Sequence, residues 1–398
     1  MLPEGWTKKT ISEIGDVVTG NTPSPSNEAN YGGDVPFVTP GDMTGAKFVD
    51  TTARTLSVTG GQQARLLPRG AILVTCIGSS IGKVGVSRAC CATNQQINAV
   101  LAGDKHDGEF VYYQLLNLSP TLQKLAGNQA VPIVNKTTFA SQSILIPSSK
   151  EEQIEIRKVI DAWDSAIATT ERLLANSRAL RQAVSNELLS GRKRFQVRHP
   201  WQAKPISDLI TESRISGSGG DEARKLTVKL YAKGVVAKAD KRKGSDATQY
   251  YRRTAGQFIY SKLDFLNGAF GLIPDDLEGY ESTLDLPAFD FRPGVNPRWF
   301  LHFVSRKAFY RGHLGLANGG RKARRVNPSD LVKVVINVPS LDEQNRIAAA
   351  IDHADQIVCA EENKLALLRA EKAALMQQLL TGKRRVRIPA AAAEAEPA

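Results

Sequence analysis

The pattern in this chain that most resembles a catalytic motif is Gly78-Ser-Ser-Ile-Gly82-Lys83-Val84. In a phosphate-binding loop, backbone amides between two glycines cradle phosphates, a lysine reaches the outer phosphates and a following Ser or Thr binds magnesium. That loop needs four residues between its glycines, whereas this segment has three and places Val84 after the lysine. We therefore expect a tight turn that touches DNA phosphate, not a nucleotide site.

Other catalytic patterns are missing from the sequence. There is no G-x-G-x-x-G, no G-x-S-x-G and no Asn-Pro-Pro-Tyr or Asp-Pro-Pro-Tyr segment of the kind that methylates a flipped adenine. The histidines lack metal-ligand spacing and the cysteines lack paired spacing, so we expect no metal site and reduced thiols. The histidines are His106, His199, His302, His313 and His353, and the cysteines are Cys76, Cys90, Cys91 and Cys359. We expect no catalysis and no bound cofactor in the chain itself.

The positive charge of the chain is concentrated in one segment. The chain has 52 Lys and Arg against 40 Asp and Glu, a net charge of +12. Residues 198–338 carry 24 basic and 14 acidic groups, and residues 1–146 carry 11 and 10. A basic surface of this kind suits a polyanionic partner.

Two groups of residues are candidates for DNA binding, because Lys and Arg neutralise phosphates and Arg, Asn and Gln read base edges. In residues 198–338 the candidates are Lys238, Lys241, Arg242, Lys243, Tyr250, Tyr251, Arg252, Arg253, Lys262, Arg321, Lys322, Arg324 and Arg325. In residues 1–146 they form a polar set of Thr75, Ser79, Ser80, Lys83, Asn94, Gln95 and Gln96. Each cluster alone is also compatible with a solvated loop, and Asn and Gln with turn or capping positions.

The chain contains an internal repeat, which decides its architecture before any single motif does. Glu152-Gln153 aligns onto Glu343-Gln344 at an offset of 191 residues, and the match continues through Gly191 and Gly382 into Arg192-Lys193-Arg194 and Lys383-Arg384-Arg385. The opening segments of the two repeats also match, and Trp6 aligns with Trp201.

Each repeated segment is predicted to be one long helix. Ser149-x-x-Glu152 and Ser340-x-x-Glu343 are capping-box patterns, and Gly191 and Gly382 are typical helix stops followed by cations. About 40 residues at 1.5 Å each predict a length of roughly 60 Å.

The apolar positions of these helices predict two seams that pack against each other. The second seam is Ile347, Ile351, Val358, Leu365, Leu368, Leu375 and Leu379, interrupted at Glu361 and Lys372. The first begins with Ile156, Ile160, Trp163 and Ile167 and then is expected to shift to Leu173, Leu180, Val184 and Leu188. Two unrelated core helices remain the alternative.

The repeat divides the chain into two domains, residues 1–146 and 198–338, and two helical segments, residues 147–197 and 339–388, with an expected disordered tail at 389–398. Short β-like runs between turns predict that both domains are α/β. The expected fold class is α+β, with two α/β domains alternating with two long helices.

Together these motifs resemble the specificity subunits of type I restriction-modification systems. The resemblance rests on Leu-Pro-Glu-Gly-Trp at the start, on Ile-Pro-Ser-x-x-Glu-Glu-Gln and Val-Pro-Ser-Leu-Asp-Glu-Gln at the helix starts, and on the closing Met376-Gln-Gln-Leu-Leu-Thr-Gly-Lys-Arg-Arg. It also includes Gly-Ser-Ser-Ile-Gly-Lys and the segment from Tyr260 to Pro274. It spans residues 2–388.

The resemblance implies two target-recognition domains that each read half of a split double-stranded DNA target, joined by antiparallel helices that set the spacing. It further implies two adenine-N6 methyltransferase subunits and motor-nuclease subunits as partners, which would hold S-adenosylmethionine, ATP and magnesium. With no apolar run long enough for a membrane span and no signal core, we expect a cytoplasmic protein without a membrane partner.

Three other functions remain open. The chain could serve a methylation-only or other defence complex, act as a coiled-coil scaffold with two protein-binding heads, or be an enzyme that uses Lys83.

Overall fold

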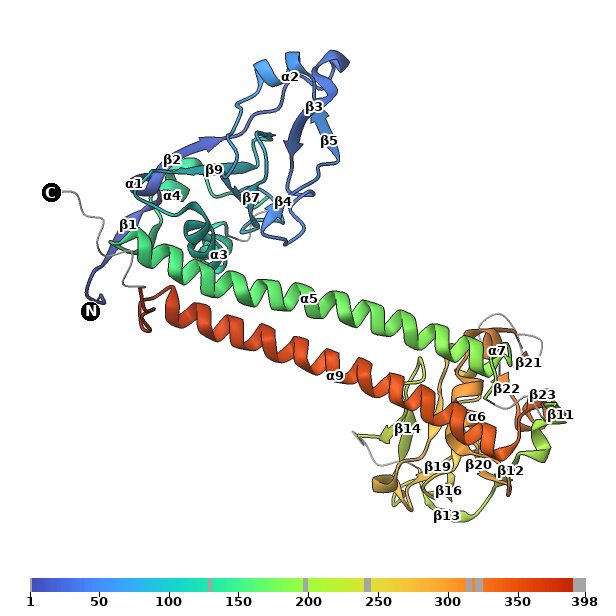
Figure 1. Ribbon diagram of the computed structural model, residues 1–398. Helices are drawn as coiled ribbons and strands as arrows, with labels where there is room; N and C mark the ends of the chain where they lie inside the picture. Colours follow the sequence, from blue (N-terminus) through green and yellow to red (C-terminus); the bar gives the residue numbers. More distant parts are fainter. Residues whose placement is uncertain are drawn as a thin grey trace. The chain divides into compact units, whose positions relative to one another are not determined.

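The computed structural model describes residues 2–127, 131–195, 200–239, 245–312, 317–318 and 325–388, and the expected tail at 389–398 lies outside them. The chain divides into two compact units, Met1–Glu171 with Lys364–Ala398, and Arg172–Asn363. Each unit combines one α/β domain with part of each of two long helices, α5 (Lys150–Leu189) and α9 (Leu341–Leu379) (Figure 1). The predicted α+β fold class is confirmed.

The first domain is built on a five-stranded sheet with the order β2-β9-β6-β7-β4. Its strands are β2 (Gly15–Thr19), β4 (Phe48–Val49), β6 (Ile72–Thr75), β7 (Val84–Ser87) and β9 (Ile97–Ala102). A smaller sheet has the order β5-β3-β8, and β1 pairs with β10. These strands are β1 (Trp6–Thr10), β3 (Tyr31–Val38), β5 (Arg54–Leu56), β8 (Ala92–Thr93) and β10 (Ser143–Pro147). The helices are α1 (Ile11–Ile14), α2 (Val58–Gln63), α3 (Gly108–Leu125) and α4 (Lys136–Ala140), with a 3₁₀ turn at Glu28–Asn30.

The second domain is built on a four-stranded sheet with the order β12-β20-β17-β18. Its strands are β12 (Ile210–Ser213), β17 (Phe258–Tyr260), β18 (Phe270–Leu272) and β20 (Ala288–Phe291). The other strands are β11 (Gln202–Pro205), β13 (Ser216–Gly219), β14 (Leu226–Val228), β15 (Val235–Ala237), β16 (Gln249–Arg252), β19 (Glu281–Ser282), β21 (Ala317–Asn318), β22 (Arg325–Val326) and β23 (Val335–Val338). The helices are α6 (Pro297–Val304), α7 (Lys307–Gly312) and α8 (Pro328–Leu331), with 3₁₀ turns at Ile206–Asp208, Phe265–Asn267, Asp275–Leu277.

The two domains share a frame and differ in what it carries. In chain order, β2, β6, β7 and β9 correspond to β12, β17, β18 and β20, and both sets have the same neighbours in their sheets. In both domains a terminal strand pair, β1 with β10 or β11 with β23, leads into a long helix. The small three-stranded sheets differ in strand order. The central strand of the first, β3, comes first of its three strands in the chain, whereas the central strand of the second, β16, comes second.

The long helices begin and end at the residues that the sequence predicts. Ser149 Oγ accepts a hydrogen bond from the Glu152 amide at 3.2 Å, and Ser340 Oγ does so from the Glu343 amide at 3.4 Å. Gly191 and Gly382 have left-handed φ values of 75° and 68° just after the two helices. At Gly382 a Cβ atom would lie 2.9 Å from the Trp6 ring, so this position also needs glycine for packing.

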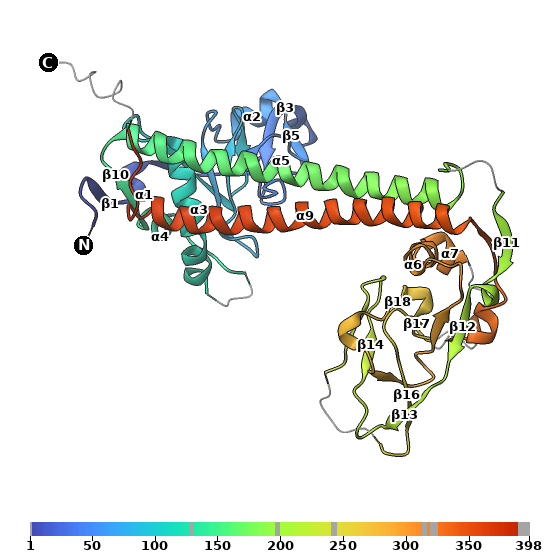
Figure 2. The same cartoon turned by 60° about the horizontal axis from the view of Figure 1, so that its bottom comes forward.

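The two helices pair antiparallel within each unit, and both views show them side by side (Figure 2). In the first unit Arg369 pairs with Glu171 at 2.6 Å, and in the second Arg178 pairs with Glu362 at 2.6 Å. Among the described residues, no helix combines the length and the apolar character that a membrane crossing requires.

The predicted seam residues of α9 are all buried or half-buried, and so are Ile156, Ile160, Trp163 and Ile167 of α5. The expected shift to Leu173 and Leu180 is wrong, because these side chains are 42% and 62% exposed. The alternating steps of three and four residues instead continue without a shift to Thr170 and Leu174, which are 2% and 7% exposed. Thr170 is polar and occupies a seam position, so the apolar pattern of the sequence did not show that the register continues.

Candidate nucleic-acid interface

The first domain brings two predicted segments together. Ser79, Ser80 and Lys83 lie in the turn between β6 and β7, and Asn94–Gln96 lie in the turn between β8 and β9. The two turns are joined where the Cys76 amide donates to the Gln96 carbonyl at 2.8 Å. The polar set of this domain therefore lies largely on two adjacent turns.

Some members of this polar set support the domain instead of facing solvent. Thr75 is fully buried in β6 and its hydroxyl lies 3.5 Å from Met43 Sδ, so its assignment to a DNA-binding surface is wrong. Asn94 donates to Gln96 Oε1 at 2.8 Å and accepts from the Gln96 amide at 3.2 Å, which fixes the turn. Gln95 is exposed and accepts from the Thr22 hydroxyl at 2.7 Å.

The turn that carries Lys83 is closed by its own backbone hydrogen bonds. The Gly82 amide donates to the Thr75 carbonyl at 3.0 Å, and the Lys83 amide donates to Ser80 at 3.2 Å. Lys83 Nζ donates to the Pro40 carbonyl at 3.0 Å. These amides are already used, so they are not available to cradle a nucleotide phosphate. The tight turn predicted from the sequence fits this geometry, and the exposed Ser79 and Lys83 remain within reach of a ligand.

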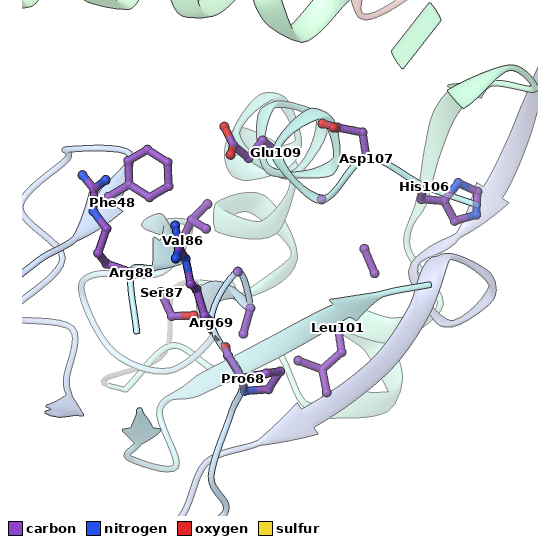
Figure 3. Close-up of a pocket in the computed structure, with 14 residues that line it drawn as sticks. Phe48, Pro68, Arg69, Val86, Ser87, Arg88, Leu101, His106, Asp107 and Glu109 are labelled. Carbon is purple, nitrogen blue, oxygen red and sulfur yellow. Dashed lines mark hydrogen bonds between the residues drawn. The ribbon is translucent and has the colours of Figure 1, made fainter. Parts of the chain in front are cut away.

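A cavity of about 390 Å³ in the first domain carries charged residues that sequence reasoning missed. Figure 3 shows Arg69 and Arg88 across from Asp107 and Glu109, which open α3. Arg88 pairs with Asp50 at 2.7 Å. Arg69 is exposed and has no side-chain partner among the described residues, so it adds a cation to the surface of a nearly neutral domain.

The second domain exposes part of its predicted basic set. Lys238 and Arg252 are exposed, and Tyr250 and Tyr251 are half-buried on β16. Arg325 is exposed and pairs with Asp285 at 3.2 Å. Six further predicted residues lie outside the described part of the chain: Lys241, Arg242, Lys243, Arg321, Lys322 and Arg324.

Arg253 is a structural residue, and its assignment to the DNA-binding surface is wrong. Its side chain is fully buried, and it donates to the Ser282 hydroxyl at 2.8 Å and to the Ser213 and Leu286 carbonyls at 2.9 and 3.3 Å. Burial lowers the pKa of Arg253 to about 10. Arg252 is the last residue of β16 and is exposed, whereas Arg253 directly follows the strand and is buried in the core.

Lys262 belongs to a second basic surface of this domain. It lines a shallow cavity of about 490 Å³ together with Arg214 and Arg292. Arg214 pairs with Glu212 at 2.9 Å, while Lys262 and Arg292 have no side-chain partner among the residues that the structure describes. Sequence clustering missed Arg214 and Arg292 because they are isolated in the sequence.

An equivalent glutamine fastens each domain to the start of its own long helix. Gln153 Oε1 accepts from the Asp107 amide at 2.8 Å, and its Nε2 donates to the Pro147 carbonyl at 3.1 Å. Gln344 repeats both bonds with Asn296 and Pro339, at 2.8 and 3.0 Å. Asp107 and Asn296 are the N-caps of α3 and α6, so the glutamines of the repeat position the starts of these two helices.

In each unit a pair of aspartates on a long helix forms a second attachment between the domain and that helix. In the first unit the domain residue is Tyr113. The Tyr113 hydroxyl lies 2.6 Å from carboxylate oxygens of both Asp161 and Asp164 on α5. Lys372 on α9 pairs with Asp164. Burial alone would raise the pKa of Asp161, but hydrogen bonds from Lys47 and Tyr113 hold it below its usual value.

The second unit repeats this arrangement with a histidine. His302 Nε2 on α6 lies 2.7 Å from Asp352 on α9, and Arg181 on α5 pairs with Asp355 at 2.7 Å. Asp352 and Asp355 align with Asp161 and Asp164 in the repeat, and Arg181 aligns with Lys372.

His302, Asp352 and Asp355 place their ligand atoms within 4.8 Å of one another, so the structure gathers carboxylates around one of the histidines that the sequence shows as scattered. Arg298 and Arg181 already pair with the two carboxylates, at 2.5 and 2.7 Å. Two cations at this position oppose metal binding, and the group acts as a salt-bridge network.

The comparisons with known proteins agree with this architecture. Residues 3–176 match the family described as type I restriction modification DNA specificity domain. Over 174 residues the chain is 35% identical to the type I restriction enzyme HindI specificity subunit of Haemophilus influenzae, covering 42% of this chain and 38% of that protein. It is 19% identical to the MjaVIII specificity subunit of Methanocaldococcus jannaschii over 97% of this chain and 94% of that one.

Two solved structures have a similar fold along most of their length. The S subunit of a type I restriction-modification system from M. genitalium has a TM-score of 0.59 and 15% identity, and the match covers 94% of this chain and 96% of that one. The HsdS subunit from Thermoanaerobacter tengcongensis has a TM-score of 0.54 and 14% identity, covering 96% and 98%. The family-model match is thus confined to residues 3–176, whereas the similarity of fold extends to both domains.

Proposed function

This chain carries the DNA specificity domain of type I restriction-modification systems within the fold of their specificity subunits, and we propose that it directs such a system to a bipartite DNA target. The observation that carries this proposal is the duplicated frame. Four strands of the second domain have the same order in their sheet as their counterparts in the first, and the second domain has the same glutamine attachment to its long helix, through Gln344 in place of Gln153. A second specificity domain in one chain would read a second half-site.

Each domain would contact DNA in its own way. The second domain has a net charge of +10 and offers the exposed Lys238 and Arg252 and the half-buried Lys262 for phosphate contacts. The first domain has a net charge of +1 and would depend on polar groups such as Ser79 and Gln95, or on partner subunits, for its share of backbone contacts. This asymmetry predicts a weaker salt dependence for contacts at the first half-site.

The chain would act as a non-catalytic targeting subunit in the cytoplasm. Two adenine-N6 methyltransferase subunits would dock on it and modify the target, and motor-nuclease subunits would add cleavage. S-adenosylmethionine, ATP and magnesium would be bound by those partners. The closed turn at Lys83 supports this division, because its Gly82 and Lys83 amides already donate to backbone carbonyls.

The long helices would fix the number of unread base pairs between the half-sites. Each helix continues from one unit into the other, so a change in its length alters the connection between two reading domains. Removing or adding one heptad in both α5 and α9 would keep their seams in register. We expect the spacing of the target to change while both half-sites stay the same.

The decisive experiment is methylome sequencing of a host that expresses this chain together with the methyltransferase subunit encoded by a neighbouring gene. The expected result is methylated adenine in a split sequence that changes when the chain is exchanged. A methyltransferase that modifies DNA equally without this chain would contradict the proposal. Adding the motor-nuclease subunit would separate a restriction complex from a methylation-only one, and a lack of salt-dependent DNA binding would favour a protein scaffold.

A further inference from the structure

The tip of the β14–β15 hairpin, residues 229–234, displays an aromatic side chain to solvent. Tyr231 is 69% exposed and its neighbour Leu230 is 39% exposed. The segment has the sequence Lys-Leu-Tyr-Ala-Lys-Gly, and both of its lysines are exposed. We call these six residues the hairpin tip.

The backbone of the hairpin tip is strained. Tyr231 and Ala232 have φ values of 60° and 54°, and no other non-glycine residue in the described part of the chain has a positive φ. A left-handed backbone is unfavourable for residues with a Cβ atom, and here two of them are consecutive. Glycine would be the ordinary choice at such positions.

Specific hydrogen bonds hold the hairpin tip in this conformation. The Tyr231 amide donates to the Asn267 carbonyl at 2.9 Å, and the Ala232 amide donates to the Gly268 carbonyl at 2.7 Å. A Cβ atom on Gly268 would lie 3.2 Å from Tyr231 Cα, so the supporting turn is itself shaped to receive the hairpin tip. The tip is thus anchored through its backbone while its largest side chain stays in water.

Strained backbone conformations persist where the surrounding structure holds them, and they cluster at ligand-binding and other functional sites. The surroundings of the hairpin tip indicate an anionic ligand. Lys229 and Lys233 have no side-chain partner among the described residues. Tyr231 and Ala232 also line the rim of a cavity of about 1080 Å³ whose lining includes Arg306 and Lys307.

Most of the charged residues that line the cavity are cations, although Arg192 and Arg298 pair with Glu187 and Asp352. Its charged lining residues are Arg181, Arg192, Arg298, Arg306, Lys307 and Asp355. Arg181 pairs with Asp355, and Arg306 donates to the Leu189 carbonyl at the end of α5 at 2.9 Å. Lys307 is exposed and has no side-chain partner in the described part of the chain.

We propose that the hairpin tip is a DNA-contacting element of the second domain, in which the Tyr231 ring packs against a base or sugar while Lys229 and Lys233 pair with phosphates. This inference rests on the proposed function. In a duplex the base faces are stacked on one another, so the ring would pack against a sugar or a base edge such as a thymine methyl, and the adjacent lysines would supply the backbone contacts that fix the ring in place. An anionic ligand is favoured over a protein partner, because the tip and the nearby Lys307 together carry three positive charges and no carboxylate.

The test uses the chain in complex with its methyltransferase subunit and a duplex that contains the sequence found by methylome sequencing. Fluorescence anisotropy would compare the wild type with Tyr231→Ala and Tyr231→Phe. Val335→Ala is the matched control, because Val335 is 61% exposed in the same domain but lies on β23. We expect Tyr231→Ala to weaken binding about tenfold and Tyr231→Phe and the control to stay within twofold. Tyr231→Gly should also weaken binding without lowering the melting temperature, because glycine relieves the strain.

The outcomes separate the two levels of inference. Wild-type affinity in Tyr231→Ala would overturn the role of the hairpin tip while specific binding by the wild-type complex would still support the proposed function. Loss of the methyltransferase subunit from Tyr231→Ala during purification would overturn it too, in favour of a protein contact. If the wild-type complex bound the target no better than a scrambled duplex, the proposed function itself would fail.

Discussion

Arg385, which follows the end of α9, donates hydrogen bonds of 2.6 and 2.9 Å to the carboxylate of Glu152 in the first turn of α5. Arg194 and Glu343 repeat this relationship in the second unit with the helices exchanged, at 3.1 and 2.8 Å. The two glutamates are 3% and 1% exposed. Each helix start is therefore bound to the segment that follows the other helix.

Replacing Arg385 by Ala should destabilise the first unit. The change leaves the buried Glu152 carboxylate without its cation, and an unpaired buried charge is strongly unfavourable. Because the Arg385 side chain is 50% exposed, we expect a loss of about 2 kcal/mol in the free energy of unfolding, less than for a fully buried pair. Urea unfolding of the full chain, followed by circular dichroism, measures this loss.

Arg384→Ala is the matched control for this prediction, since Arg384 is exposed and has no side-chain partner among the described residues. The double variant of Glu152→Gln with Arg385→Ala should lose less than the sum of the two single changes. Strict additivity would mean that the two residues do not interact.

Gln344→Glu should unfold the second unit more easily than Gln344→Ala. Gln344 Nε2 donates to the Pro339 and Gly294 carbonyls at 3.0 and 3.3 Å, and a carboxylate would set a buried negative charge against both. The alanine variant leaves buried polar groups unpaired, which costs about 1–3 kcal/mol. Differential scanning calorimetry would compare the melting temperatures, with the exposed Gln356→Glu as control. Equal melting temperatures for Gln344→Glu and the wild type would contradict the proposed attachment.

The ends of the long helices could be predicted because their signals are local. A serine three residues before a glutamate and a glycine that adopts a positive φ act within one turn of the helix, as Ser149 and Gly191 do. The capping-box prediction was only half correct. The serine caps the helix, but the Glu152 side chain pairs with Arg385, a partner 233 residues away that no local pattern contains.

The candidate interface was harder to predict, because the sequence alone does not show whether a charged side chain points to solvent or into the core. Arg252 and Arg253 look alike in a basic cluster, yet Arg252 at the end of β16 is exposed and Arg253 just after it is buried. The partners of Arg253 are Ser213, Ser282 and Leu286, which are distant in the sequence. The strained Tyr231 was not predictable, because its left-handed backbone depends on the turn at Gly268.

Stability should fall as the pH drops below about 6.5, and His302 should account for part of the loss. Burial lowers the pKa of His302, an effect that the nearby Asp352 only partly offsets. The unfolded state therefore takes up the proton first, near the ordinary pKa of histidine. The stabilising contribution is complete above that pH and is lost as the pH falls toward the lower pKa of the folded state. Urea unfolding between pH 8 and pH 5.5 tests this.

His302→Gln should flatten the pH dependence between pH 6.5 and pH 5.5, because glutamine can still hydrogen bond to Asp352 without titrating. His106→Gln is a useful comparison, since burial also lowers the pKa of His106 in the first unit. If both variants retained the full slope of the wild type, the loss would have to come from carboxylates. Asp352 itself has a lowered pKa, since hydrogen bonds from Arg298 and His302 outweigh its burial, and its contribution is lost only below about pH 4.

Arg252→Ala and Arg253→Ala should have opposite effects although the residues are adjacent. Arg252→Ala removes an exposed cation, so DNA affinity should fall a few-fold and the salt dependence of binding should decrease by about one phosphate contact. Its melting temperature should stay within about 2 °C of the wild type, as for an ordinary surface substitution. Arg253→Ala removes three buried hydrogen bonds, which should cost about 3 kcal/mol and lower the melting temperature by roughly 6–12 °C. Anisotropy titrations at several salt concentrations, paired with calorimetry on the same preparations, measure both effects. A stable Arg253→Ala variant with weakened DNA binding would show that Arg253 turns outward when DNA is bound, and would return it to the interface.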